Sequence, residues 1–150
     1  MKKKERLTAY QYLLKDKLSG DKNRELIALL KDIKLAGRQV AKELNSATLN
    51  NTIGEMYGKK NTHGEDVKKL DIVANNLFIQ SLENGGNCAG IVSEEKEKVL
   101  IFNNEVSRNS KYLVCIDPLD GSTNIDVNVP VGTIFSVLKR PSLGDKTFSK

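Results

Sequence analysis

Helical periodicity occupies the first half of this chain and strand patterning the second, and this order limits the fold more than any other feature. Residues 24–44 and 65–83 repeat apolar side chains every three or four positions, which predicts two amphipathic helices. Four short apolar runs rich in β-branched residues follow, and they predict strands at 89–95, 98–102, 111–117 and 131–139. Helices followed by strands predict a layered fold of the α/β or α+β class.

The two predicted helices have defined apolar faces and ends. The face of the first consists of Leu26, Leu29, Leu30, Ile33, Gly37, Val40 and Leu44, and that of the second of Val67, Leu70, Val73, Ala74, Leu77, Phe78 and Ser81. Asn45-Ser46 is expected to end the first helix, and the Gly-rich run 84–87 the second. A shorter helix is predicted at 7–18, within an N-terminal arm at 1–22, and a loop at 49–63.

The last predicted strand, at 131–139, bears on domain organisation. A chain of 150 residues has the length of one ordinary domain. This strand would leave a half-paired, exposed edge if no further element followed it. We therefore expect residues 1–150 to be one N-terminal domain, an incomplete fragment of a larger protein.

Composition excludes several classes of protein. With 39% hydrophobic and 29% charged residues, the chain is expected to be soluble and globular. No apolar run approaches the ~20 residues of a membrane-spanning helix, and the N-terminus lacks the apolar core of a signal peptide. Cys88 and Cys115 form no CxxC pair and make a poor disulfide framework. A cytoplasmic protein that binds no membrane fits these features best.

The net charge of +5 is unevenly placed. Residues 1–60 hold 14 Lys and Arg against 7 Asp and Glu, whereas residues 61–150 hold 10 against 12. A basic half can bind nucleic acid or anionic metabolites. Here the lysines are scattered over a helical pattern without interleaved aromatic residues, which favours a solvated face, and no nucleic-acid partner is expected.

The segment D-P-L-D at 117–120 follows the apolar run K-Y-L-V-C and places two carboxylates around a proline. Pro118 fixes its own φ and favours an extended conformation at Asp117. The turn can bring both carboxylates to one side with the Leu119 carbonyl between them, and Mg²⁺ and Mn²⁺ prefer such hard oxygen ligands. A turn that starts at Asp-Pro and is capped by Asp120 would need the same residues without any metal.

Other acidic residues occupy suggestive positions. Glu94-Glu95 directly follows A-G-I-V-S, and strand ends line the ligand crevice of α/β proteins, although a charged hairpin tip explains the pair alone. Asp71 borders the apolar face of its helix, where it could pair with a lysine or face Glu95 and orient a nucleophilic water as general base. Glu65-Asp66 could simply cap the same helix. His63 lies in a Gly-flanked loop without a partner at ligand spacing, so neither zinc nor a His-based nucleophile is expected.

Gly121-Ser122-Thr123 supplies backbone N–H groups and two hydroxyls directly after the candidate metal ligands. If a helix begins here, its free N–H groups favour a phosphate, although Ser and Thr also cap helices without a ligand. An anion site beside a carboxylate-metal site is what phosphoryl chemistry requires, because the metal offsets phosphate charge while N–H donors hold the oxygens.

The run D-P-L-D-G-S-T-N-I-D, followed by V-G-T-I-F, closely resembles the class I fructose-1,6-bisphosphatases of the sugar phosphatase superfamily. The upstream blocks G-E-D-V-K-K-L-D, V-S-E-E and K-Y-x-V-C resemble further family blocks in the family's order, so the resemblance covers residues 24–139. It implies a layered α-β-α sugar phosphatase fold of the α+β class, with N-terminal helices packed on a mixed, largely antiparallel sheet and truncated before a second domain.

The resemblance also implies the reaction and the roles of single residues. Glu94, Glu95, Asp117, Asp120 and the Leu119 carbonyl would hold Mg²⁺ or Mn²⁺. Asp71 with Glu95 would activate the attacking water, and Glu65 stands where the family usually has an assisting Asp. Asp120, Gly121, Ser122 and Thr123 would surround the 1-phosphate. The implied enzyme is a cytoplasmic homotetramer that hydrolyses fructose 1,6-bisphosphate to fructose 6-phosphate and phosphate, a gluconeogenic step.

Departures from the family pattern concern regulation and completeness. Animal members bind inhibitory AMP through Thr-Gly-Glu-Leu-Thr, and the aligned residues 23–27 lack both threonines. Lys111 and Tyr112 match other AMP contacts, whereas Lys139 stands where an arginine is expected. The family's sugar and 6-phosphate contacts would follow residue 150, so this portion is expected to be inactive by itself.

Two alternatives remain open. D-P-L-D-G-[ST] alone also admits inositol monophosphatase relatives or other small-molecule phosphatases, which substrate profiling would separate. The second alternative is an inactive regulatory module that keeps the anion site. The intact acidic set, which consists of Asp71, Glu94, Glu95, Asp117 and Asp120, argues against it.

Overall fold

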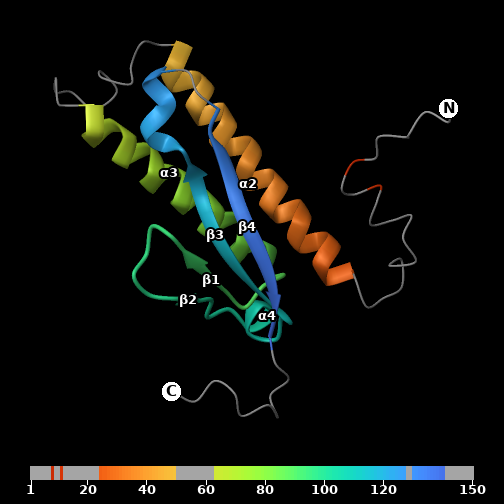
Figure 1. Cartoon of the computed structure of the whole chain (residues 1–150). Helices are drawn as coiled ribbons and strands as arrows, with labels where there is room; N and C mark the ends of the chain where they lie inside the picture. Colours follow the sequence, from red (N-terminus) through yellow and green to blue (C-terminus); the bar gives the residue numbers. More distant parts are fainter. Residues whose placement is uncertain (1–7, 9–10, 12–23, 50–62, 128–129, 141–150) are drawn as a thin grey trace, which may run out of the picture.

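The computed structural model describes residues 8, 11, 24–49, 63–127 and 130–140 (Figure 1). The predicted arm at 1–22 with its helix at 7–18, and the predicted loop at 49–63, lie almost entirely outside these residues. The described elements, in chain order, are α2 (Arg24–Leu49), α3 (His63–Gly85), β1 (Gly90–Ser93), β2 (Leu100–Ile101), α4 (Glu105–Arg108), β3 (Tyr112–Asp120), η2 (Ser122–Val127) and β4 (Gly132–Lys139).

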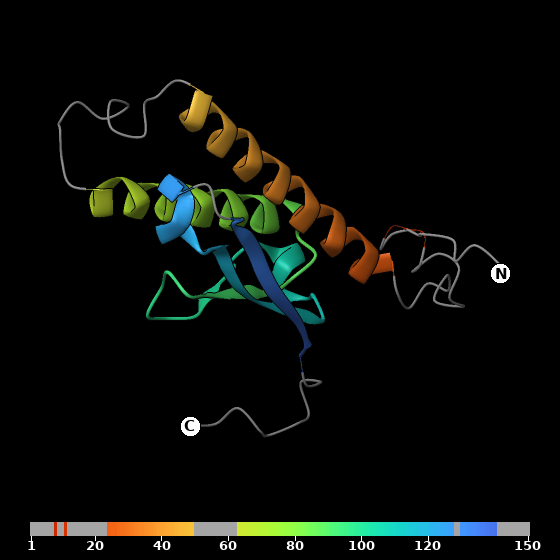
Figure 2. The ribbon, with the colours of Figure 1, turned by 45° about the horizontal axis from the view of Figure 1, so that its top comes forward.

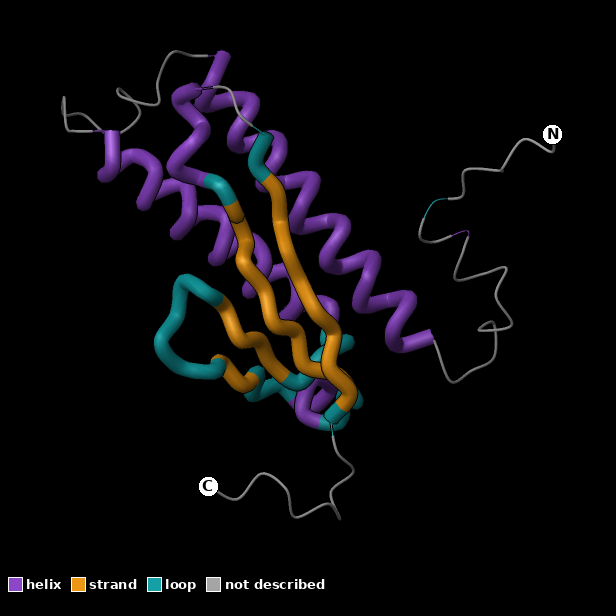
Figure 3. The backbone as a smooth tube through the Cα atoms, viewed as in Figure 1, coloured by secondary structure: helices purple, strands orange, loops and turns teal. Residues whose placement is uncertain are grey.

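The four strands form one sheet in the order β2-β1-β3-β4 (Figure 3). β1 pairs antiparallel with β2 and parallel with β3, and β3 pairs antiparallel with β4 from Tyr112 to Asp120. The predicted mixed, largely antiparallel sheet is confirmed. Its single parallel pairing positions the candidate site, because it brings the C-terminal ends of β1 and β3 to the same edge.

Both long helices lie on one face of the sheet, as Figure 2 shows from the side. α3 contacts β1 and β3, and α2 packs against α3. The core between them contains the buried side chains Leu29, Ile33, Ala36, Val40, Ala74, Phe78, Leu82, Ile91, Val114 and Ile116. Each large side chain buried in this way contributes about 1.5–3 kcal/mol through loss of apolar contact with water. The predicted α+β fold with helices packed on a sheet is therefore confirmed.

Alternation along β1 shows which face of the sheet the described helices cover. Ile91 and Ser93 face the helices and are buried, whereas Val92 between them is exposed. On β4, Ile134 and Leu138 are 60% and 50% exposed. The described residues thus bury one apolar face of the sheet beneath the helices and leave apolar side chains exposed elsewhere on it.

Several element boundaries differ from the predicted ones. α2 continues through Asn45-Ser46 to Leu49, because polar residues on a solvated helix face weaken a helix without ending it. α3 begins at His63, so this residue belongs to a helix and not to a loop. The predicted strand at 98–102 shrinks to Leu100–Ile101, both exposed. α4 is too short for periodicity to predict; Asn104 caps it by accepting a hydrogen bond from the Ser107 N–H at 2.8 Å.

None of the described helices could cross a membrane. Neither α2 nor α3 combines the length and the apolar character that a bilayer-crossing segment needs.

Candidate active site

Two acidic segments meet where the parallel strands β1 and β3 end. Ser93 of β1 lies opposite Ile116 of β3, and the Glu94 N–H continues the pairing with a 3.0 Å hydrogen bond to the Ile116 carbonyl. A turn follows at once, because the Lys96 N–H donates to the Ser93 carbonyl at 3.1 Å. Glu94 and Glu95 therefore form the centre of this turn, beside Asp117 on the neighbouring strand. The predicted strand at 89–95 ends two residues earlier than expected for this reason.

The segment D-P-L-D lies within β3, at an irregularity of that strand. The sequence analysis instead predicted that these four residues form a turn that follows the strand. Asp117 pairs with Ile134 and Asp120 with Gly132, so β3 carries one more residue than β4 between these two pairs. Pro118 is buried there and cannot donate a ladder hydrogen bond, which is why the pairing shifts at this point.

Two hydrogen bonds fix this bulge. The Leu119 N–H donates to Asp117 Oδ1 at 3.1 Å, and the Thr133 hydroxyl donates to the Pro118 carbonyl at 2.9 Å. The first bond orients the Asp117 carboxylate. The second gives the Pro118 carbonyl a hydrogen-bond partner at the point where the regular strand pairing is interrupted. Thr133 belongs to the V-G-T-I-F motif and Pro118 to the D-P-L-D motif, so this hydrogen bond joins the two motifs.

Gly121 connects β3 to the short 3₁₀ helix η2. Its φ of +79° lies in the left-handed region, which residues with a Cβ rarely adopt. The chain can therefore reverse directly after Asp120, and η2 begins at Ser122 as the sequence analysis allowed. The Ser122 hydroxyl donates a 3.2 Å hydrogen bond to Asp71 Oδ2 on α3.

Asp71 and Glu95 lie close enough for their charges to interact. Burial is the largest cause that raises the pKa of Asp71; the Ser122 hydrogen bond opposes it, and the charges of Asp117 and Glu94 reinforce it. Burial also raises the pKa of Glu95, and the Asp71 charge is the next largest cause. α3 and the turn after β1 thus bring together the two carboxylates that were predicted to act as a pair.

Asp117 belongs to the same electrostatic group. Burial raises its pKa, the Leu119 N–H lowers it, and the charges of Asp120 and Glu94 raise it further. An open depression nearby is lined by Glu94 and Asp117 together with Val92, Ile116 and Ile134. The acidic residues that the sequence singled out between positions 71 and 120 therefore converge on one edge of the sheet.

These carboxylates suit a divalent cation by their chemistry. Mutually repelling carboxylates with raised pKa values are groups that a bound hard cation would stabilise in their ionised form. Within residues 24–49, 63–127 and 130–140, no three His, Cys, Asp or Glu side chains converge closely enough to hold a metal ion together. Glu94 and Asp120 are exposed, so their side chains have room to change rotamer. The donor set fits Mg²⁺ in type.

Three further predicted site residues, Leu119, Thr123 and Glu65, differ in burial and in the element that carries them. Leu119 is buried, Thr123 is exposed in η2, and Glu65 belongs to the first turn of α3. The side chain of Glu65 lies outside the described part of the structure.

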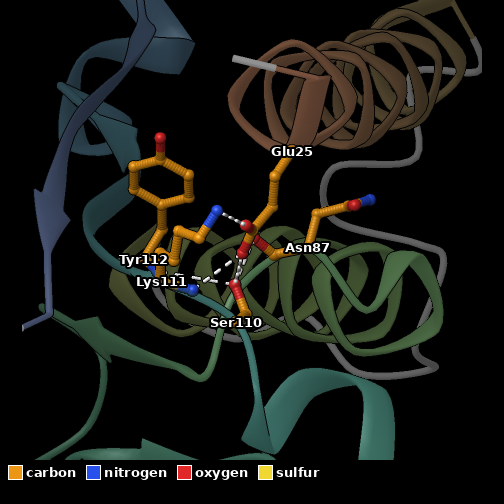
Figure 4. A network of polar contacts seen from close by, with 5 residues as sticks. All are labelled: Glu25, Asn87, Ser110, Lys111 and Tyr112. Carbon is orange, nitrogen blue, oxygen red and sulfur yellow. Dashed lines mark hydrogen bonds and ion pairs between the residues drawn. The ribbon is translucent and has the colours of Figure 1, made fainter. Parts of the chain in front are cut away.

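Lys111 and Tyr112 lie at the other end of β3, where they take part in a polar network with α2 (Figure 4). The Lys111 N–H donates to Glu25 Oε1 at 2.7 Å, and the Lys111 ammonium lies 3.6 Å from Glu25 Oε2. The Ser110 hydroxyl contacts the same carboxylate and also the Asn87 carbonyl at 2.7 Å. The Glu25 carboxylate thus binds the backbone and side chain of Lys111, which the resemblance assigned to a nucleotide.

Sequence reasoning missed three residues that support the site. Asn75 and Ser93 are buried and hydrogen-bonded to each other, and Thr133 supports the bulge. Asn75 lies among the apolar positions of α3, and a polar residue at such a position is a signal for a buried partner. That partner could not be identified from the sequence, because it depends on how α3 is placed on the sheet.

Comparison with known proteins defines the family. The model of the family described as "Fructose-1-6-bisphosphatase, N-terminal domain" matches residues 8–150 of this chain. The chain belongs to the fructose-1,6-bisphosphatase family and corresponds to its N-terminal domain, which confirms the resemblance inferred from the motifs.

Solved structures support the same assignment. The holo form of Leishmania major fructose-1,6-bisphosphatase is 28% identical with a TM-score of 0.72, and the match covers 91% of this chain and 39% of that one. The T-state form of the same protein is 29% identical with a TM-score of 0.67, over 92% and 39% of the two chains. The apo form gives 29% and 0.66, over 90% and 37%. The chain thus spans about two fifths of the length of these relatives.

Proposed function

We propose that this chain carries the metal and 1-phosphate half of a Mg²⁺-dependent fructose-1,6-bisphosphatase. The reaction is the hydrolysis of fructose 1,6-bisphosphate to fructose 6-phosphate and inorganic phosphate, a step of gluconeogenesis. The observation that carries the proposal is the convergence of Asp71, Glu95 and Asp117 with Ser122 at one sheet edge of a chain in this family.

In this proposal Asp71 and Glu95 activate the nucleophile. The oxygen of a water molecule attacks the phosphorus of the 1-phosphate, the bond between phosphorus and the sugar oxygen breaks, and the sugar oxygen takes up a proton to form the hydroxyl of fructose 6-phosphate. The Asp71 carboxylate, next to Glu95, accepts the proton that the water loses. The partial burial of Asp71 and its electrostatic interaction with Glu95 support this role, because they place the two carboxylates near one another at the edge of the sheet.

The end of β3 and the start of η2 bind the phosphate. Asp120, Gly121, Ser122 and Thr123 surround the 1-phosphate, and the left-handed conformation of Gly121 directs the chain from the carboxylates into η2. The hydrogen bond between Ser122 and Asp71 supports this arrangement, because it joins the phosphate-binding segment to the proposed base.

Glu94, Glu95, Asp117, Asp120 and the Leu119 carbonyl would hold Mg²⁺, or Mn²⁺ in its place. Such an ion would supply positive charge that stabilises the phosphate and lowers the pKa of a bound water. Glu65 assists Asp71 in this proposal. The complete enzyme is proposed to be a cytoplasmic homotetramer, and the 150-residue chain alone to be inactive, since it spans 39% of the length of the first matched relative.

Substrate profiling of the full-length protein tests the proposal. Phosphate release is measured with fructose 1,6-bisphosphate and with inositol 1-phosphate, each with and without Mg²⁺. We expect fructose 1,6-bisphosphate to be hydrolysed preferentially and only with the metal. Preference for inositol phosphate would instead identify an inositol monophosphatase-like enzyme, and no turnover of either substrate would identify an inactive regulatory module.

A further inference from the structure

A buried pair of polar side chains joins α3 to the turn that carries Glu94 and Glu95. The Ser93 hydroxyl donates a 2.7 Å hydrogen bond to Asn75 Oδ1, and the two residues are 3% and 1% exposed. Both lie within the apolar layer between the helices and the sheet. Two apolar side chains of similar shape could fill that space at little cost to stability, since a buried hydrogen bond adds only about 1 kcal/mol net.

The same Ser93 hydroxyl contacts the acidic turn. It accepts a hydrogen bond from the Glu95 N–H at 3.3 Å, while the Ser93 carbonyl accepts one from the Lys96 N–H at 3.1 Å. A serine that accepts from the amide two residues later fixes the conformation of the turn between them. Ser93 therefore sets where Glu94 and Glu95 lie.

The other partner, Asn75, sets where Asp71 lies. Asn75 follows Asp71 by four residues on α3, so the two side chains lie one helical turn apart on the same face. A bond from Asn75 to Ser93 therefore fixes the helix that carries Asp71 relative to the turn that carries Glu95. The Ser122–Asp71 hydrogen bond ties α3 to η2, whereas the Asn75–Ser93 bond ties α3 directly to the strand that carries the Glu94-Glu95 turn.

We propose that Asn75 and Ser93 are positioning residues for the hydrolytic reaction. They touch neither substrate nor metal, and they hold Asp71 and the Glu94-Glu95 turn at the separation that proton transfer requires. This inference rests on the proposed function. Groups that orient the residues around a metal typically change affinity or activity by about 10- to 100-fold when they are removed.

Ser93→Ala, Asn75→Ala and the double variant of the full-length protein test the proposal, and Ser107→Ala is the matched control. Ser107 is fully buried like Ser93, and its hydroxyl is without a hydrogen-bond partner among the described residues. Four quantities are measured: kcat and KM for fructose 1,6-bisphosphate, the Mg²⁺ concentration for half-maximal activity, and the hydrogen-exchange rate of the Glu95 amide without metal.

Both single variants are expected to lower kcat about 10- to 100-fold with KM changed less than about threefold, and to raise the Mg²⁺ requirement. The double variant should be no worse than the more impaired single one, because Asn75 acts on the turn through its hydrogen bond with Ser93. Asn75→Ala should also speed exchange of the Glu95 amide, although Asn75 does not contact Glu95. Ser107→Ala should leave all four quantities unchanged.

A role in stability alone predicts a different result. If Ser93→Ala and Asn75→Ala lower the melting temperature but keep the wild-type kcat per folded molecule, the inference is overturned while the proposed function stands. If the wild-type protein releases no phosphate from fructose 1,6-bisphosphate, the proposed function fails and this inference fails with it.

Discussion

At the scale of single residues, the ionised Asp117 side chain destabilises the metal-free fold, and the same side chain is proposed to bind the metal. Its raised pKa means that ionisation is less favourable in the folded chain than in the unfolded one. The sign follows directly: the carboxylate destabilises the fold above its folded pKa, and this penalty disappears as the pH falls below the unfolded pKa.

Asp117→Asn tests this cost without changing the shape of the side chain. We expect the metal-free variant to be more stable than the wild type at pH 7 and equally stable near pH 3, in urea unfolding curves. The amide oxygen can still accept from the Leu119 N–H, so the bulge is kept. Added Mg²⁺ should stabilise the wild type and not the variant. A wild type that is more stable than Asp117→Asn without metal would contradict this account.

Gly121 gives a second prediction at this scale, because its φ of +79° strains any residue with a Cβ. Gly121→Ala is expected to lower the free energy of unfolding by about 1–2 kcal/mol. The control is Gly132→Ala, where an added Cβ meets nothing within 4 Å and should not destabilise the strand. Chemical denaturation measures both, and equal effects of the two substitutions would contradict the role given to Gly121.

At the scale of elements, the Glu25 carboxylate attaches α2 to the start of β3. Burial alone would raise the pKa of Glu25, but hydrogen bonds from Ser110 and Lys111, together with the Lys111 charge, outweigh burial and lower it. A lowered pKa adds stability that is present above the unfolded pKa and is lost as the pH falls through the folded pKa. The start of α2 should therefore detach from the sheet in acid.

Glu25→Gln tests this attachment. At pH 7 the variant should lose about 1 kcal/mol of unfolding free energy, mainly from weaker hydrogen bonds, since an ion pair with the half-exposed Lys111 contributes little. Near pH 3 the variant and the wild type should be equally stable. Glu43→Gln, an exposed position on the same helix, is the control and should have no effect at either pH. A constant difference across the pH range would show that the charge of Glu25 is unimportant.

The helices and strands also show which parts of the fold could be predicted from the sequence. Apolar periodicity located both long helices and every strand of the sheet, because burial on one face determines where such side chains occur. The bulge in β3 was predicted as a turn, since D-P-L-D has turn residues but the pairing of β4 with Asp120 extends the strand. Helix α4 escaped prediction because four residues are too few to show a period.

For the candidate site, the sequence identified the acidic residues, while their partners required the fold. Asp71 and Ser122 are 51 residues apart in sequence, and only the packing of α3 on the sheet brings them within a hydrogen bond. Residues with reactive side chains can be recognised from type and spacing. Supporting residues such as Asn75 and Thr133 have ordinary side chains, and their importance depends entirely on neighbours that the sequence does not specify.

At the scale of the whole molecule, one parallel strand pair within a mostly antiparallel sheet accounts for the site. It brings the ends of β1 and β3 together beneath α3, so three acidic segments meet at one edge. Membership of the fructose-1,6-bisphosphatase family and the match to Leishmania major structures agree with this fold. We propose that this edge hydrolyses the 1-phosphate of a sugar bisphosphate with the help of Mg²⁺.

The most direct test is phosphate release from fructose 1,6-bisphosphate by the full-length protein, its Asp117→Asn variant and a Glu83→Gln control at an exposed carboxylate of α3. We predict that Asp117→Asn lowers kcat at least ~100-fold while the protein remains folded. Glu83→Gln should keep the wild-type rate. Near-normal turnover by Asp117→Asn would contradict the account.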